Sequence, residues 1–136
     1  MKQIRTIDRE SFAPFGNVLA FSNEDAKPFE IIVREASHGW RMAVYQPPAA
    51  PCLFLEKHPD SRESFEPIRG IALLLVATED APAEFETFVL DKPVCLYSGI
   101  WHNCIVLSSD ALLGVTENDE VASEFYQLDR PAVPSI

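Results

Sequence analysis

Two short polar segments stand out in an otherwise apolar chain, and both contain residue types that exchange protons near neutral pH. In the first segment, alternation along a predicted strand places Glu56 and His58 on one face, and Glu63 follows five residues after His58. The second segment, residues 97–103, contains His102. Histidine and glutamate can act as general acid and general base. If the fold brings the two segments together, they form a site for acid–base chemistry.

The elements that must position these residues are short strands. Proline and glycine account for 11 and 5 of the 136 residues and separate short apolar runs, which is typical of an all-β chain with many turns. The predicted strands are residues 16–21, 29–35, 40–46, 53–58, 66–68, 71–78, 85–90, 94–97, 103–107 and 111–116. Their spacing is that of a sandwich or barrel. Asp8 is a candidate N-cap for one helix of at most two turns, which Pro14 and Gly16 would end.

Length and charge narrow the class of protein further. A chain of 136 residues with 47% hydrophobic residues can bury one core, so we expect residues 1–136 to form a single domain. The net charge of −10 repels phosphates and anionic membrane surfaces, which argues against nucleic acid or membrane as a partner. A small anionic substrate would approach against the same field. It would therefore need a local cation, either a metal ion or a buried arginine.

Cysteine usage and the first residues of the chain predict a cytoplasmic protein. Cys52, Cys95 and Cys104 are an odd number without C-x-x-C spacing, as expected in a reducing compartment. Cys95 and Cys104 are interpreted as small buried hydrophobic residues. Residues 1–5 lack the apolar run of a signal peptide, and no run approaches the roughly 18 apolar residues of a membrane span. His38 lies in a loop-like stretch and is interpreted as a surface residue.

The spacing of the polar residues resembles that of the cupin motifs. His58, Glu63 and Gly70 fit the second half of the first motif, H-x-H-(x3-4)-E-(x6)-G, and Gly99 and His102 fit the G-x-x-H of the second. The resemblance implies an all-β fold: a single cupin-type β-barrel (a double-stranded β-helix or jelly roll) with at most one short N-terminal helix. It also implies four metal-ligand positions, which are Glu56, His58, Glu63 and His102.

A longer stretch of the chain resembles the ureidoglycolate lyase family, a cupin branch that acts in allantoin and purine breakdown. Residues 56–67, E-K-H-P-D-S-R-E-S-F-E-P, resemble the family's E-R-H-P-x-x-x-Q-x-F-x-P, and residues 101–104, W-H-N-C, resemble its W-H-H-P. Residues 12–19 are similar to its opening F-x-x-(Y/F)-G-x-V-(I/L). The resemblance implies a carbon–nitrogen lyase that cleaves ureidoglycolate to glyoxylate and urea, or a close relative that acts on a small 2-hydroxy or 2-oxo acid.

The chain departs from the family pattern at residues that bear on mechanism. Glu63 replaces the family's glutamine, Asn103 replaces the second histidine of W-H-H, and Tyr97 replaces a histidine four residues before the tryptophan. The family's strand arginine is absent, and Arg41 lies three positions away, on the face of the strand opposite to that position. With Glu63, the implied ligand set becomes two imidazoles and two carboxylates, which suits Mn, Fe, Zn or Ni. Without a metal, the buried groups must share protons and shift their pKa values.

The resemblance and the chemistry of the side chains together suggest roles for individual residues. The four expected catalytic residues are the implied metal ligands themselves: Glu56, His58, Glu63 and His102. Tyr97 and Arg41 are the expected substrate-binding residues. Arg62 and Arg69 are further candidates to hold a substrate carboxylate, because a guanidinium group binds it with two parallel hydrogen bonds.

Several interpretations stay open at the level of the sequence. The polar residues could be a hydrogen-bonded cluster without chemistry, a non-catalytic small-ligand-binding cupin site, or the site of a metal-dependent cupin isomerase or oxygenase. Trp101 and Lys57 are expected to point away from the cavity, and residues 117–120 are interpreted as a solvated acidic turn. The expected partners are a small-molecule substrate and a second copy of the chain, since a homodimer would cover exposed strand edges.

Overall fold

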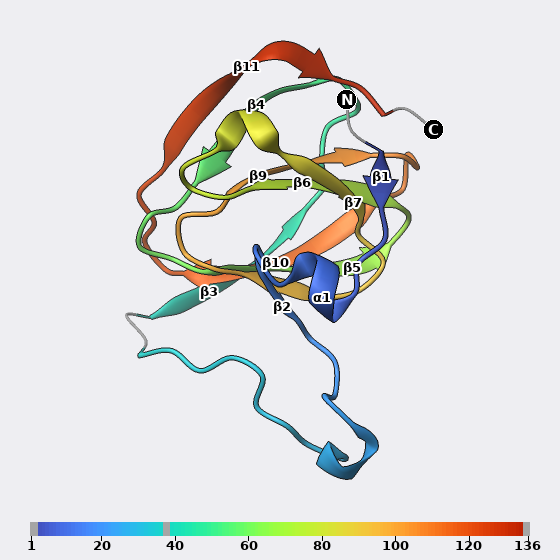
Figure 1. The fold of residues 1–136 in the computed structure, drawn as a ribbon, viewed down its shortest axis with the longest axis vertical. Coiled ribbons are helices and arrows are strands. Elements are labelled where there is room, and N and C mark those ends of the chain that lie inside the picture. The colour runs from blue at the N-terminus through green and yellow to red at the C-terminus, as the bar shows by residue number, and fades with distance from the viewer. Residues whose placement is uncertain (1–2, 37–38, 135–136) are drawn as a thin grey trace.

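Two β-sheets face one another in the computed structural model, which describes residues 3–36 and 39–134 (Figure 1). The six-stranded sheet contains, in spatial order, β1 (Ile4–Arg5), β7 (Glu86–Val89), β6 (Ala72–Ala77), β9 (Trp101–Val106), β4 (Cys52–Lys57) and β11 (Glu124–Ala132). The five-stranded sheet contains β2 (Gly16–Val18), β8 (Val94–Leu96), β5 (Glu63–Arg69), β10 (Leu112–Asn118) and β3 (Trp40–Tyr45). Paired strands are antiparallel except for β1 and β7. This jelly-roll-like sandwich confirms the predicted all-β fold class.

One short α-helix lies near the start of the chain, as the sequence predicted. In α1 (Arg9–Phe12), Asp8 Oδ1 accepts a hydrogen bond of 2.8 Å from the Ser11 backbone N–H, and the Asp8 backbone N–H donates to Ser11 Oγ at 3.2 Å. This reciprocal capping box satisfies backbone donors that the short helix leaves unpaired. Two 3₁₀ turns, η1 (Glu24–Ala26) and η2 (Pro82–Glu84), are the other helical elements of the described chain. None of these helices has the length and apolar composition needed to span a membrane.

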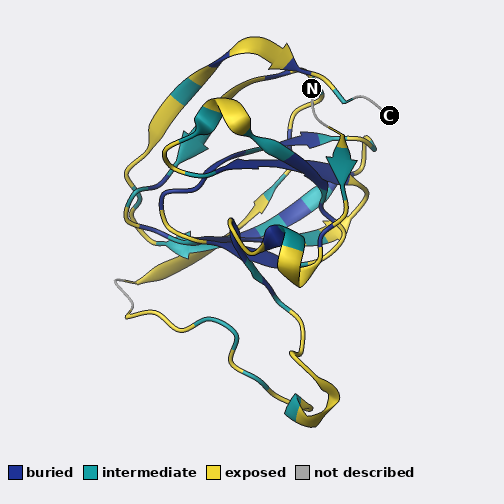
Figure 2. Cartoon of the chain, viewed as in Figure 1, coloured by how far each residue is buried: buried dark blue, intermediate teal, exposed yellow. Residues whose placement is uncertain are grey.

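Strand β6 is the centre of the hydrophobic core. All six of its residues are buried, as expected for a strand that is apolar on both faces (Figure 2). Leu74 and Val76 pack between the two sheets with Phe65 and Phe88, whereas Leu75 belongs to a second cluster that includes Trp101 and Leu128. The six-stranded sheet is therefore covered on both faces, and β9 beside β6 is rigidly held.

Two glycines of the sequence motifs stand at turns that lead into buried strands. Gly70 (φ 69°) lies just before β6 and Gly99 (φ 80°) lies just before β9, and both have left-handed backbone conformations. A Cβ atom at Gly70 would lie 2.6 Å from the backbone of Ala111, so a larger residue cannot fit there without moving the chain. The motif glycines thus set how two strands enter the sandwich.

The structure shows that the predicted strand at residues 29–35 was wrong. Residues 29–36 pair with neither sheet and belong to an arm, residues 21–36, that leaves the body of the molecule between β2 and β3 (Figure 1). A strand forms only where a neighbouring backbone takes up its hydrogen bonds, and no described strand pairs with this segment. Strand β5 begins earlier than predicted, at Glu63. His38, interpreted above as a surface residue, lies outside the described residues.

Candidate active site

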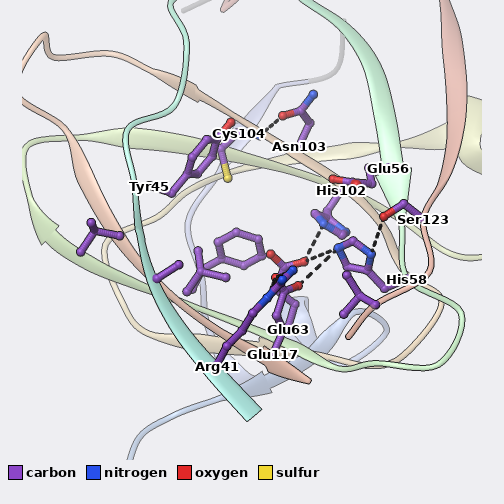
Figure 3. A pocket seen from close by; sticks show the side chains of 15 residues that line it. Arg41, Tyr45, Glu56, His58, Glu63, His102, Asn103, Cys104, Glu117 and Ser123 are labelled. Carbon is purple, nitrogen blue, oxygen red and sulfur yellow. Dashed lines mark hydrogen bonds and ion pairs between the residues drawn. The ribbon is translucent and has the colours of Figure 1, made fainter. Parts of the chain in front are cut away.

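A cavity of about 350 Å³ lies between the two sheets and is lined by the polar residues that the sequence singled out (Figure 3). The six-stranded sheet contributes Glu56 from β4 and His102 from β9. The five-stranded sheet contributes Arg41 from β3, Glu63 from β5 and Glu117 from β10. Residues far apart in the sequence therefore meet in one place because each lies on the inner face of its strand.

Strand register determines which of these side chains are neighbours. Glu56 on β4 lies directly opposite His102 on β9. Glu117 on β10 lies opposite Glu63 on one side and Arg41 on the other. Residues opposite one another in adjacent strands project from the same face. One sheet thus presents a row of three charged side chains to the glutamate and histidine of the other sheet.

Glu63 lies between two histidines at the centre of the cavity. Its Oε1 atom is 2.8 Å from Nε2 of His102 and 3.1 Å from Nε2 of His58, which follows β4 (Figure 3). The relative exposures of Glu63, His58 and His102 are only 8%, 6% and 6%. The Nε2 atom of His58 is also 3.5 Å from Glu117 Oε1. The buried carboxylates of Glu63 and Glu117 require a compensating positive charge nearby. Protons on the two imidazole rings or a bound cation can supply it.

Backbone carbonyls fix the orientation of both imidazole rings. Nδ1 of His102 lies 2.9 Å from the carbonyl oxygen of Ile100, and Nδ1 of His58 lies 3.1 Å from that of Ala122. A carbonyl oxygen can only accept a hydrogen bond, so each Nδ1 carries the proton, and Ser123 Oγ shares the His58 proton at 3.2 Å. In the neutral form, the lone pair of each ring therefore resides on Nε2, the atom that faces the cavity. This is the tautomer that metal-binding histidines adopt.

The buried cluster shifts the pKa values of its members strongly. Burial opposes the charged form of His58, but the adjacent Glu63 carboxylate and the Ala122 carbonyl outweigh it and raise the pKa of His58 to about 9. Burial likewise opposes ionisation of Glu63, yet the two histidines lower its pKa to about 2. The pKa of His102 is also raised, because its contact with Glu63 outweighs its burial. Without a cation, Glu63 therefore favours the protonated form of both imidazoles, and His58 is an imidazolium at neutral pH.

The residues fit a divalent cation as well as they fit protons. The buried Oε1 atoms of Glu63 and Glu117 have no aligned hydrogen-bond donor, although ring nitrogens lie close to both. Three carboxylates and one arginine line the cavity, which leaves two negative charges when both imidazoles are neutral. The potential ligand atoms fall into two overlapping groups within 4.8 Å: Glu56, His58 and His102, and His58, Glu63 and Glu117. The four ligand positions that the resemblance implied are all included, and Glu117 is an additional one.

Glu117 is the main site residue that sequence reasoning missed, because residues 117–120 were interpreted as a solvated turn. The structure places Glu117 in β10 with a side chain only 10% exposed, where its Oε2 accepts hydrogen bonds from Arg41 Nε (3.1 Å) and Nη2 (2.8 Å). The available signal was alternation, since the buried residues Val115 and Leu113 lie two and four positions earlier. The predicted strand at residues 111–116 needed only one more residue to include it. These hydrogen bonds to Glu117 hold the Arg41 side chain at the wall of the cavity.

Tyr45 is a second lining residue without an assigned role in the sequence analysis. It follows Arg41 and Ala43 on the inner face of β3 and is partly buried. Burial and the neighbouring Cys104 and Glu56 raise the pKa of Tyr45 to about 12. Its hydroxyl is therefore protonated at all physiological pH values and can donate a hydrogen bond into the cavity.

Three residues that the sequence proposed for substrate binding do not line this cavity. Tyr97 is 38% exposed and stacks with the guanidinium group of Arg62, 5.1 Å from the ring centroid, in a separate hollow. Arg62 also donates hydrogen bonds to the Asn17 side chain and to the Cys95 carbonyl. Arg69 donates to the backbone carbonyl of Asp110. Of the four candidates, the cavity thus contains only Arg41.

The residues expected to point away from the cavity do so. Trp101 packs in the cluster on the other face of its sheet, and its indole Nε1 donates a 2.9 Å hydrogen bond to the Glu79 carbonyl. The Lys57 ammonium lies 4.9 Å from the Trp101 ring centroid and 3.8 Å from the Glu79 carboxylate. Cys95 and Cys104 are buried, as predicted. Strand alternation therefore assigned these side chains to the correct faces.

The fold and the cavity together define a jelly-roll-like β-sandwich protein with a buried histidine–carboxylate site between its sheets. Comparison with known sequences relates this chain to the curated ureidoglycolate lyases of Brucella ovis, Brucella suis and Brucella abortus. Each is 28% identical to it over 121 residues, which cover 74% of this chain and 72% of the relative. The chain is thus a distant homologue of ureidoglycolate lyase, and the resemblance seen in the sequence is confirmed.

The chain was also compared with protein-family profiles and with solved structures. No family profile matches the chain. Among solved structures, oxalate decarboxylase, including that of Bacillus subtilis, aligns with a TM-score of 0.44 and 17% sequence identity over 62% of this chain. The chain spans only 23% of the first of those structures, less than a quarter of its length.

Proposed function

We propose that this protein is a carbon–nitrogen lyase that cleaves ureidoglycolate to glyoxylate and urea, or a close relative that acts on a small 2-hydroxy or 2-oxo acid. The observation that carries the proposal is the pair of Nδ1-anchored histidines on either side of Glu63 in an enclosed cavity. Such a cluster can hold an acid and a base within reach of one small substrate. The distant homology to ureidoglycolate lyases supports the same reaction.

The reaction needs one base and one acid. A proton leaves the substrate hydroxyl, the O–H electron pair forms the new carbonyl bond, the C–N bond breaks, and the urea nitrogen accepts a proton. With a pKa of about 9, His58 is protonated at neutral pH and can supply the second proton. Glu117 Oε1 has no aligned hydrogen-bond donor, and Glu56 also faces the cavity, so either carboxylate can accept the first. Glu63 is the positioning residue that raises the pKa of both imidazoles and holds them in place.

Substrate binding is assigned to Arg41 and to a cation where one is present. Arg41 uses Nε and Nη2 on a single oxygen of Glu117, so its remaining N–H groups can take a substrate carboxylate at the cavity wall. A divalent cation held by Glu56, His58 and His102, or by His58, Glu63 and Glu117, would make the substrate hydroxyl more acidic, and His58 would then be a ligand instead of the acid. The three buried cysteines, which are unpaired thiols, favour a cytoplasmic location for this activity.

A non-catalytic binding protein is the second candidate, and Asn103 favours it. The Asn103 side chain donates a 2.7 Å hydrogen bond to the Phe54 carbonyl and accepts one from the Cys104 backbone N–H. It thus fulfils a structural role where the family pattern has a second histidine. A site without that group could retain binding and lose turnover.

Release of glyoxylate and urea from ureidoglycolate distinguishes the candidates. The chelator-treated protein is assayed alone and after addition of Mn²⁺, Zn²⁺, Fe²⁺ or Ni²⁺. The His58→Gln variant is assayed in the same way, with Glu66→Gln, at an exposed residue on the same strand as Glu63, as the control. We expect turnover that falls by about 10²–10⁴-fold in His58→Gln and is unchanged in Glu66→Gln. Binding without turnover under every condition would establish the binding protein instead. Metal-dependent loss of a substrate without urea release would indicate an isomerase or oxygenase.

A further inference from the structure

Strand register arranges the side chains of β3, β10 and β5 in three successive rows. The charged row described above consists of Arg41, Glu117 and Glu63. The next row is apolar and consists of Ala43, Val115 and Phe65. The third row consists of Tyr45, Leu113 and Pro67. Tyr45 is the polar member of this third row, and it lines the cavity as Arg41 does.

The cavity therefore has a charged end and a neutral end. Tyr45 lies beside Cys104, away from Arg41 and Glu117 (Figure 3). Burial raises the pKa of the Cys104 thiol, and it raises the pKa of Tyr45 to about 12. Both side chains thus keep their protons at neutral pH. A ligand that fits the whole cavity needs an anionic group at one end and an uncharged polar group at the other.

The Tyr45 hydroxyl is available for such a ligand. The Tyr45 ring packs against the core cluster between the sheets, which holds the side chain in place. No other residue of the described chain forms a hydrogen bond with its hydroxyl. A tyrosine hydroxyl that is partly buried usually has a hydrogen-bond partner. The donor is therefore free to bind an acceptor oxygen in the cavity.

We infer that Tyr45 is a specificity-determining residue of this site, because its hydroxyl donates a hydrogen bond to the ureido carbonyl oxygen of a substrate whose carboxylate is bound by Arg41. The inference rests on the proposed function and narrows it. Between ureidoglycolate and simple 2-hydroxy or 2-oxo acids, it selects the acid whose second carbon carries a nitrogen-linked carbonyl group.

The spacing of the two anchors fits a substrate of this length. Arg41 and Tyr45 are four residues apart on one strand, which separates their side chains by about 13 Å. Two hydrogen bonds of about 2.9 Å leave roughly 7 Å between the two acceptor oxygens. Ala43, between the anchors, has a short side chain that leaves this space open.

Bond lengths separate the candidate substrates. Five bonds join a carboxylate oxygen of ureidoglycolate to its ureido oxygen, a span of about 6 Å when extended. In glycolate or glyoxylate only three bonds join the corresponding oxygens, which gives about 3–4 Å. Ureidoglycolate can therefore reach both anchors, whereas the shorter acids reach one.

A hydrogen bond at the ureido oxygen also assists the reaction proposed above. When the C–N bond breaks, its electron pair passes to the urea nitrogen and is shared with the adjacent carbonyl oxygen. A donor placed at that oxygen stabilises the developing negative charge. The scissile bond lies nearer the Arg41 end of the substrate, where His58 can protonate the nitrogen.

The first test measures binding and needs no turnover. Ureidoacetate keeps the carboxylate and ureido groups but lacks the hydroxyl that the reaction requires, and glycolate lacks the ureido group. Both are titrated calorimetrically into the chelator-treated native chain, Tyr45→Phe, Arg41→Met and Tyr126→Phe. Tyr126, which packs against Trp101 on the other face of its sheet, is the matched control.

We expect Tyr45→Phe to weaken ureidoacetate binding by about 10-fold, the effect of one hydrogen bond, and to leave glycolate binding unchanged. Arg41→Met should weaken the binding of both acids, and Tyr126→Phe should change neither. A native chain that does not bind ureidoacetate, or equal ureidoacetate affinity in Tyr45→Phe, would overturn the inference. An equal loss for glycolate in Tyr45→Phe would also overturn it, because Tyr45 would then only support β3.

The second test separates this inference from the proposed function. The value of kcat/KM for ureidoglycolate should fall by about 10-fold or more in Tyr45→Phe and stay unchanged in Tyr126→Phe. Turnover with equal kcat/KM in the native chain and Tyr45→Phe would retain the lyase and refute the role of Tyr45. Ureidoacetate binding that depends on Tyr45, without release of glyoxylate from ureidoglycolate, would retain the contact and refute the lyase.

Discussion

Replacing Glu63 with glutamine tests the central claim about the site, that one buried carboxylate holds the charge of two histidines. In the metal-free protein the pKa of His58 is about 9, compared with 6.5 in the unfolded chain. A difference of this size corresponds to about 3 kcal/mol of stability, at ~1.4 kcal/mol for each pKa unit. Because the folded pKa is raised, this contribution is complete below pH 6.5 and is lost as the pH rises through 9.

The carboxylate sets the lower limit of the same window. The pKa of Glu63 is about 2 in the folded protein and 4.5 in the unfolded chain, so the stabilisation is lost again as the pH falls from 4.5 through 2. Both shifts describe one interaction and are not additive. Glu63→Gln should therefore destabilise the chelator-treated protein most between pH 4.5 and 6.5, by about 3 kcal/mol, and much less at pH 10.

Urea unfolding of the native chain and of Glu63→Gln at pH 6 and pH 10 measures this difference. Groups that titrate equally in both proteins cancel, so the change in the difference reports the cluster alone. Glu66→Gln, an exposed residue on the same strand, should change stability by less than about 0.5 kcal/mol at either pH. An equal loss for Glu63→Gln at pH 6 and pH 10 would refute the ion-pair description of the site.

Three further predictions follow from the site and the core. Binding of Mn²⁺ or Zn²⁺ should weaken as the pH falls and should release protons, because His58 must lose its proton to become a ligand; calorimetry in buffers of different ionisation enthalpy counts those protons. Arg41→Met should raise KM for an anionic substrate more than it lowers kcat, whereas Arg69→Met, whose guanidinium group binds a backbone carbonyl elsewhere, should change neither in steady-state assays. Leu75→Ala should lower the free energy of unfolding by about 2–5 kcal/mol, since Leu75 is fully buried, and Leu107→Ala, at a residue 47% exposed, by less than about 1 kcal/mol, as measured by urea denaturation.

The sequence predicted the site where local pattern and motif spacing act together. Strand alternation predicted that Glu56 and His58 share one face, and the motif spacing linked these two residues to Glu63 and His102. All four residues line the cavity. Glu117 could not be placed in the same way, because its role depends on the register of β10 between β3 and β5. Register is a property of three strands, and no short segment contains that information.

The arm shows a different limit of sequence reasoning. Residues 29–35 have the composition of a strand, but composition expresses only the preference of a segment for extended backbone. Whether that preference is realised depends on a neighbouring backbone, and no described strand of the molecule pairs with the arm. Tyr97 is a related case, since its position near the second motif did not reveal that it turns toward Arg62 instead of the cavity.

The burial of β6 has a consequence for the time scale on which different parts of the site can move. Amide protons of β6 and of β9 beside it should exchange with solvent only when the whole molecule unfolds, because both faces of the sheet are packed there. His102 therefore belongs to the most persistent part of the protein. Arg41, on edge strand β3, belongs to a part that can open by local fraying in a single copy. The wall that carries His102 would stay closed through many openings of the wall that carries Arg41.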